Sequence, residues 1–124
     1  MLGGFAERYQ LSTEHAMRLS SAFGGGIART GQLCGAVSGA LMAIGLAHGA
    51  TTADDQTSKE KTYTVTKELW SRFRERHGSI VCRELLGVDI GTPEGRQAAI
   101  RNGLFKTRCP VFVRFAAEIA VQLL

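Results

Sequence analysis

Three cysteines are the residues of this 124-residue chain with the most specific chemistry: Cys34, Cys82 and Cys109. The intervals between them, 48 and 27 positions, are too long for a local zinc knuckle. Any site that they share must therefore be assembled by the fold. The opening residues MLGGFAERYQ do not resemble a secretory leader. We therefore expect a reducing, cytoplasmic location, where thiols act as metal ligands or redox groups more often than as structural disulfides.

Each cysteine falls near the predicted start of a helix. Thr30 is a candidate cap for a helix that contains Cys34, Ser79 is a candidate cap for a short helix through residue 86 that contains Cys82, and Cys109 opens the last helix. Helix starts lower the pKa of a thiol and favour the thiolate, which attacks disulfides and binds metals. The alternative is that these cysteines are buried and serve as small apolar side chains.

The helix that contains Cys34 is predicted to be the centre of the fold. Gly31–Gly49 carries no charged side chain and mixes small residues with Leu, Met and Ile, which is typical of a helix packed on nearly all sides. Gly24, Gly25 and Gly26 precede it, but no Gly-Lys-Ser/Thr follows, so a phosphate-binding loop is not indicated. We expect these glycines to turn the backbone sharply, and with Gly35 to supply backbone for a cofactor near the cysteines.

The remaining patterns are also helical, and no segment alternates as a strand should. The predicted fold class is all-α: a single-domain helical bundle, residues 1–124, of about five to six helices around the small-residue helix. The expected elements are the tail of a helix over 1–9; a helix capped by Thr13 that runs to Phe23, with Ala16, Leu19 and Phe23 inside; a helix begun by Asp54 or Asp55 and ended by Gly78, with Tyr63, Thr66, Trp70, Phe73 and His77 on one face; a helix begun by Thr92-Pro93; and a last helix with Phe112, Phe115, Ala116, Ile119 and Leu123 inside.

Charge and hydropathy exclude several kinds of partner. The net charge is +4, and the most basic stretch, 67–83, also carries Glu68 and Glu75, so no nucleic-acid surface is indicated. The apolar run 33–50 is short, rich in Gly and Ala, and contains His48, so we expect no stable membrane insertion. His48 and His77 end helices, where an imidazolium suits the negative pole. They are minor metal-ligand candidates, and His15 is a weaker one.

Several segments resemble a known family. FGGGIARTGQLCGAVSGALMAIGL, GSIVCRELLG, TPEGR and GLFKTRCP are similar to the four-cysteine C_GCAxxG_C_C family of redox-active proteins, whose central CGAxxG motif corresponds to Cys34–Gly39. The resemblance covers nearly the whole chain. It implies a helical redox or electron-transfer protein with an unidentified redox partner, in a family often encoded near transporters. The family's first cysteine lies upstream of the segment matching 3–9, which implies an N-terminal helix truncated here.

Two classes of function are consistent with these observations. In the first, Cys34, Cys82 and Cys109 converge near Gly24–Gly26 as thiolates that hold an iron–sulfur cluster or another metal, or that cycle through a disulfide. A fourth cluster ligand would then come from His, Ser, water or another subunit. In the second, the chain is a non-catalytic interaction module that forms a homo-oligomer or packs on a partner, with structural cysteines. Membrane association through 33–50 is a third and weaker possibility.

Overall fold

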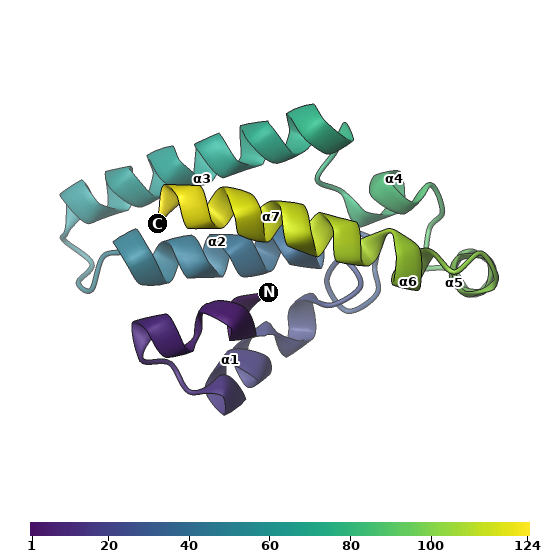
Figure 1. Cartoon of the computed structure of the whole chain (residues 1–124), viewed down its shortest axis with the longest axis horizontal. Helices are drawn as coiled ribbons and strands as arrows, with labels where there is room; N and C mark the ends of the chain where they lie inside the picture. Colours follow the sequence, from purple (N-terminus) through teal and green to yellow (C-terminus); the bar gives the residue numbers. More distant parts are fainter.

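The fold is all-α, as predicted. A computed structural model describes residues 1–124, and it contains no β-strand, only an isolated bridge between Leu33 and Val81. Figure 1 shows the arrangement. The elements are the 3-10 helices η1 (Leu2–Phe5), η2 (Glu7–Tyr9) and η3 (Ser21–Phe23), and the α-helices α1 (Thr13–Ser20), α2 (Gly35–His48), α3 (Gln56–His77), α4 (Cys82–Leu86), α5 (Pro93–Arg101), α6 (Leu104–Thr107) and α7 (Cys109–Leu123).

The core lies between the three longest helices. α2 packs against both α3 and α7, which also contact each other (Figure 1). The largest fully buried side chains are Val37 and Ile44 of α2 and Leu69 and Phe73 of α3. The small residues of α2 allow these neighbours to approach closely, so its central position is confirmed. None of the helices combines the length and the hydropathy needed to cross a membrane.

The boundaries of α3 were predictable, but its buried face was only partly so. The side chain of Asp55 accepts a hydrogen bond from the backbone N–H of Ser58, and the left-handed Gly78 ends the helix, as expected. The buried stripe runs through Val65, Leu69 and Phe73. Tyr63, which the spacing places on one face with Phe73 and His77, is 50% exposed and does not belong to this stripe. Tyr63 is two residues before Val65, which rotates it by about 200° from the buried stripe.

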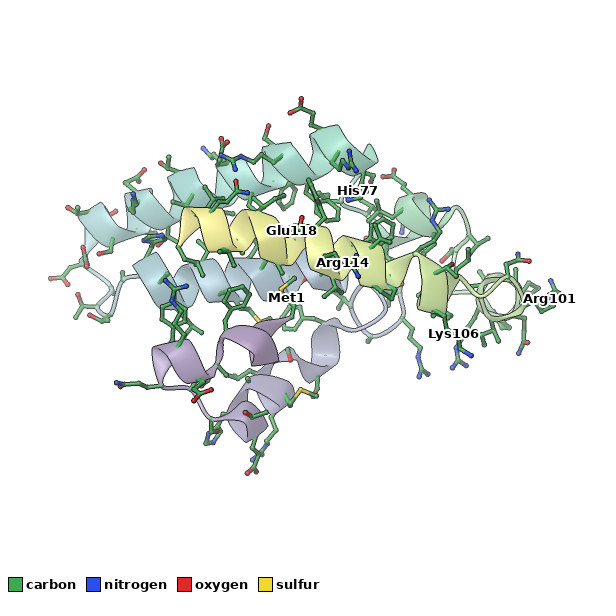
Figure 2. All side chains as sticks on the ribbon, in the orientation of Figure 1. Met1, His77, Arg101, Lys106, Arg114 and Glu118 are labelled. Carbon is green, nitrogen blue, oxygen red and sulfur yellow. The ribbon has the colours of Figure 1, made fainter.

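The N-terminal segment departs most from expectation. Residues 2–9 form two 3-10 turns and not the tail of an α-helix. Met1, labelled in Figure 2, lies against Gly39 of α2. Ala16 is buried in a small separate cluster with Leu2 and Ala6. Leu19 is 61% exposed and not inside as predicted, because α1 packs mainly through Ala16.

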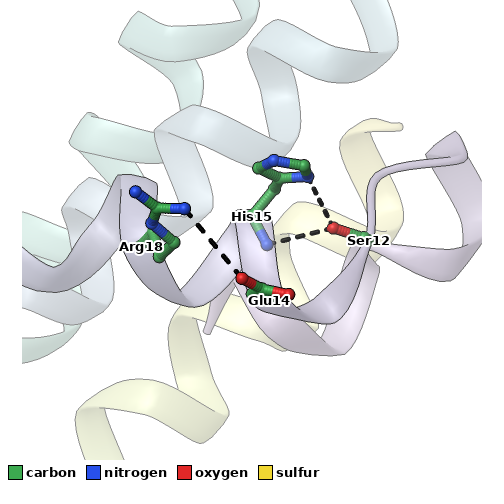
Figure 3. A network of polar contacts seen from close by, with 4 residues as sticks. All are labelled: Ser12, Glu14, His15 and Arg18. Atoms are coloured by element: carbon green, nitrogen blue, oxygen red, sulfur yellow. Dashed lines mark hydrogen bonds and ion pairs between the residues drawn. The ribbon is translucent and has the colours of Figure 1, made fainter.

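The start of α1 is capped by Ser12, one residue before the predicted Thr13. Figure 3 shows that the Ser12 hydroxyl accepts a hydrogen bond from the backbone N–H of His15 and lies 2.7 Å from its Nδ1. An exposed ion pair between Arg18 and Glu14, at 3.9 Å, follows on the same helix (Figure 3). His15 therefore takes part in a capping arrangement at the surface.

The short helices α4, α5 and α6 gather at the end of the bundle where α2 and α7 begin (Figure 1). α5 starts as predicted: the Thr92 hydroxyl accepts a hydrogen bond from the backbone N–H of Gly95, and Pro93 is the first helical residue. Its only buried residue is Ala99, and α6 has none. The last helix begins at Cys109 as expected, with Phe112, Ala116 and Ile119 buried.

Candidate functional site

A single pocket of about 840 Å³ is lined by all three cysteines and by Gly24, Gly25, Gly26 and Gly35. Cys34 is the N-cap of α2, and Cys82 and Cys109 are the first residues of α4 and α7. Two of the predicted helix starts were wrong. α2 begins at Gly35 and not near Thr30, and the N-cap of α4 is Val81 and not Ser79. The structure nevertheless places every cysteine at the start of a helix.

Backbone pairing brings Cys34 and Cys82 together. The N–H of Cys34 donates to the carbonyl of Ile80 at 2.8 Å, and the N–H of Cys82 donates to the carbonyl of Gln32 at 2.6 Å. The N–H of Arg83 donates to Gly31 at 3.1 Å. These bonds join the segment before α2 to the segment before α4. This pairing could not be predicted from the sequence, because the paired segments are only a few residues long.

The segment before α2 is an unusual turn. Residues 25–29, here called the left-handed turn, all have positive φ angles, between 50° and 68°. Three of them, Ile27, Ala28 and Arg29, are not glycine, and each such residue costs about 1–3 kcal/mol. The hydroxyl of Thr30 donates to the carbonyls of Gly26 and Ile27. Thr30 therefore stabilises this turn and does not cap α2.

Gly26 is required where the left-handed turn meets α4. A Cβ atom at this position would lie 2.6 Å from the Cβ atom of Cys82 and 2.7 Å from the backbone nitrogen of Gln32, and its φ of 66° disfavours other residues. The glycine run thus makes a sharp turn beside the cysteines, in the position that the sequence predicted. It also brings backbone directly against Cys82.

The electrostatics of the thiols differ from the prediction. Helix starts were expected to lower the pKa of the thiols, but the pKa of each is raised. Burial raises the pKa of Cys34 more than the backbone N–H groups of Ala36 and Val37 lower it. Burial also raises the pKa of Cys109, and the nearby Cys34 raises it further, while Arg108 lowers it. The cost of burying a negative sulfur therefore exceeds the benefit of the helix start.

Cys82 is the most strongly affected thiol. Its pKa is raised to about 11, first by burial and then by the negative charges that Cys34, Cys109 and Asp89 can carry. Because Cys34 and Cys109 both contribute, the three sulfurs lie near enough to influence one another. At neutral pH all three are therefore protonated thiols.

The predicted metal site does not appear as a preformed cage. All three cysteines are free, and no group of three Cys, His, Asp or Glu side chains is arranged to hold a metal ion. The histidines lie elsewhere: Nε2 of His48 is 2.8 Å from the carbonyl oxygen of Leu123, and neither His15 nor His77 lines the pocket. Burial, followed by the charge of Arg76, lowers the pKa of His77, so it is not the imidazolium that was expected.

Two residues of the pocket were missed by the sequence reasoning. Arg29, on the left-handed turn, and Arg96, on α5, are the only charged side chains in its lining, which is otherwise mostly hydrophobic. Arg29 follows the glycine run closely, and this was the only available signal. Nothing in the pattern around Arg96 distinguishes it from an ordinary exposed arginine.

Comparison with known proteins gives one family. Residues 1–123 match the family described as "Putative redox-active protein (C_GCAxxG_C_C)". The comparison with curated proteins gives no match, and neither does the comparison with solved structures. The cysteine pattern in the family's name contains four cysteines, whereas this chain has three.

Proposed function

The chain belongs to the C_GCAxxG_C_C family, and from this premise we propose that it is a thiol redox protein in which two of Cys34, Cys82 and Cys109 cycle between dithiol and disulfide. The observation that carries the proposal is the convergence of three free thiols, from positions far apart in the sequence, on one pocket. Cys34 raises the pKa of both other thiols, so we propose it as the common member of the reacting pairs.

The reaction is a thiol–disulfide exchange. One cysteine loses its proton and attacks a disulfide of the oxidant, which forms a mixed disulfide and releases one thiolate. A second cysteine then displaces the remaining half. In total, two protein thiols become one disulfide, and the oxidant's disulfide takes up two electrons and two protons and becomes two thiols. The raised thiol pKa values leave only a small fraction of thiolate at neutral pH, so the first attack on the oxidant is slow there.

The test counts thiols. The reduced protein is treated with a small disulfide at pH 8.5, and its free thiols and intact mass are then measured. Loss of two thiols and of two hydrogens from the monomer mass is expected. Cys34→Ser should reduce this oxidation most, whereas Ser38→Ala, a change at a buried residue in the first turn of α2, should leave it intact. Retention of all three thiols, or disulfides formed only between molecules, would contradict the proposal.

The same cysteines suggest a metal-dependent alternative. An iron–sulfur cluster or another metal would draw on Cys34, Cys82 and Cys109 after their sulfurs had moved together, with a further ligand from outside this set. Anaerobic purification followed by iron and sulfide analysis tests this alternative. Stoichiometric iron and sulfide, lost in Cys→Ser variants, would replace the dithiol proposal.

Burial of the cysteines favours a second candidate function. Cys34 and Cys82 are part of the main hydrophobic core, and all three thiols have raised pKa values, as structural cysteines do. A helical interaction module would then be the function. Thiols that stay unlabelled in the native protein, together with a fully folded variant lacking all three cysteines that keeps the same oligomeric state, would support this reading.

A further inference from the structure

The pocket that contains the thiols also carries two positive side chains and no negative one. Arg29 and Arg96 approach it from different elements, the left-handed turn and α5. We propose that the pocket binds a small organic disulfide that bears carboxylates, with Arg29 and Arg96 as its anion-binding groups. This inference deepens the thiol redox function proposed above and rests on it.

Neither arginine is neutralised by the protein. The two ion pairs of the chain join Arg18 to Glu14 and Arg72 to Glu68, and both lie outside the pocket lining. Asp89 is near Cys82, but its carboxylate accepts a hydrogen bond from the backbone N–H of Gly91 and does not line the pocket. Two guanidinium groups with free donors are suited to carboxylates, which they bind through paired hydrogen bonds.

The position of Arg29 is fixed by the glycine run. A Cβ atom at Gly25 would lie 2.8 Å from Cγ of Arg29, so the stem of this arginine crosses directly over the glycine. The backbone N–H of Arg29 donates to the carbonyl of Gly24 at 3.1 Å, which holds the residue at its positive φ. Strained backbone of this kind concentrates at ligand-binding segments. The turn thus places Arg29 at the pocket at the expense of backbone strain.

The rest of the pocket fits the body of such a ligand. Its volume of about 840 Å³ is within the range of small-molecule sites. Ile100, Phe105 and Val113 line it and are partly exposed, so they offer apolar contacts to a short carbon chain. A ligand whose carboxylates contact the arginines would present its central sulfur–sulfur bond to the thiols. The two electrons and two protons of the protein dithiol would then convert it into two carboxylate-bearing thiols.

The test compares three small disulfides of different charge. The rate of loss of protein thiols is measured with 3,3′-dithiodipropionate, which is a dianion, bis(2-hydroxyethyl) disulfide, which is neutral, and cystamine, which is a dication. We expect the dianion to react fastest. In the variant carrying both R29Q and R96Q, its advantage over the neutral disulfide should fall by about tenfold or more, the effect of losing at least one charged hydrogen bond.

Two further variants control for charge and for folding. Arg101 is at the end of α5, outside the pocket lining, and Figure 2 shows it with Lys106 at the outer end of the molecule. R101Q/K106Q changes the net charge as much as the double arginine variant does, and should keep the preference for the dianion. R29K retains the charge and should keep most of that preference. An equal loss in R101Q/K106Q and R29Q/R96Q would overturn the proposal.

A ligand without sulfur separates binding from chemistry. Octanedioate matches dithiodipropionate in length and charge but cannot be reduced, and its binding is followed by amide chemical shifts of Arg29, Arg96 and their neighbours. If it binds while the thiols resist all three disulfides, the redox function fails and the anion site stands. If the thiols react with all three disulfides at similar rates and octanedioate does not bind, the redox function stands and this inference is wrong.

Discussion

The side chain of His77 is enclosed by aromatic rings at the end of α3. Its ring centroid lies 4.8 Å from that of Phe73, 5.1 Å from that of Phe112 and 4.9 Å from that of Phe115. Its Nε2 atom is buried and has no hydrogen-bond partner. The ring therefore packs as a neutral aromatic group, and a proton on it would place a poorly solvated charge among phenylalanines.

His77 should make the protein less stable in mild acid. Because the folded protein lowers the pKa of His77, the unfolded chain binds a proton more readily as the pH falls below about 6.5. The free energy of unfolding should therefore decrease between pH 7.5 and pH 5.5, as measured by urea denaturation. His77→Gln should remove most of this decrease, whereas the exposed His15→Gln should retain it. The same slope in both variants would contradict the role given to His77.

The reactivity of the thiols should change with pH in the alkaline range, in contrast to the effect of His77 in mild acid. Because the pKa of Cys82 is about 11, its alkylation by iodoacetamide should be slow at pH 7 and should rise about tenfold per pH unit until the pH approaches that value. The free energy of unfolding should correspondingly fall as the pH rises from about 9 towards 11, because the unfolded thiol ionises first. Cys34→Ser removes a neighbouring charge and should shift the Cys82 labelling profile to lower pH. Labelling of Cys82 at the rate of the denatured protein at pH 7 would contradict this assignment.

At the scale of elements, the left-handed turn determines the shape of the pocket. It joins η3 to the segment before α2, passes against Cys82 and carries Arg29. Its conformation is held by the Thr30 hydroxyl and by backbone bonds such as that from the N–H of Gln32 to the carbonyl of Gly26, at 2.8 Å. Substitutions in this turn should therefore change the free energy of unfolding more than substitutions in an ordinary exposed loop.

Two neighbouring glycines test this view. Gly26→Ala should lower the free energy of unfolding by about 2–5 kcal/mol, because it adds a collision with Cys82 to an unfavourable φ angle. Gly24→Ala should be neutral or stabilising by up to about 1 kcal/mol, since Gly24 has a φ of −66° and its nearest neighbour would be 3.9 Å from the new Cβ atom. Urea denaturation measures both values. Equal effects of the two changes would refute the assigned turn geometry.

Sequence patterns predicted the helices well where the ends carry clear signals. Asp55, Gly78 and the Thr92-Pro93 pair mark boundaries that the structure confirms. Sequence patterns did not predict the segment before α2 correctly. The turn there places Ile27 and Ala28 at positive φ, which contradicts the backbone preferences of those residues. Thr30 looked like a helix cap because its hydroxyl can accept a backbone hydrogen bond, but here it donates to the turn instead.

The site was predictable in its cysteines and not in its electrostatics. The start of the last helix at Cys109 could be inferred locally, because a proline follows it. The caps expected at Thr30 and Ser79 were wrong, although Cys34 and Cys82 still lie at helix starts. Burial of the sulfurs depends on helices from the whole chain, and it decides the direction of the pKa shifts. Arg96 reaches the pocket only through the placement of α5, for which no local pattern exists.

On the scale of the whole molecule, the buried core and the candidate site lie in regions of different packing. The main core lies among α2, α3 and α7, whereas α5 buries only Ala99 and α6 buries nothing. The wall of the pocket that carries Arg96 is therefore held by few buried contacts. Elements of this kind open locally without unfolding the rest.

Hydrogen exchange should reveal this difference. Amides in the middle of α2, α3 and α7 should exchange only through global unfolding, whereas those of α5 and α6 should exchange faster through local opening. Saturating octanedioate should slow exchange in α5, since a ligand bound through Arg96 stabilises the closed wall. Uniform protection across all seven α-helices would contradict this description.

The separation of the cysteines along the chain has a consequence for heat resistance. A bond between the sulfurs of Cys34 and Cys82 would close a loop of 48 peptide units, and loops of this size restrict the unfolded chain by about 4 kcal/mol. Oxidised protein should therefore melt at a clearly higher temperature than reduced protein, and calorimetry in graded thiol buffers would measure the reduction potential. The thermal stability of such a chain would therefore be greatest in the most oxidising surroundings.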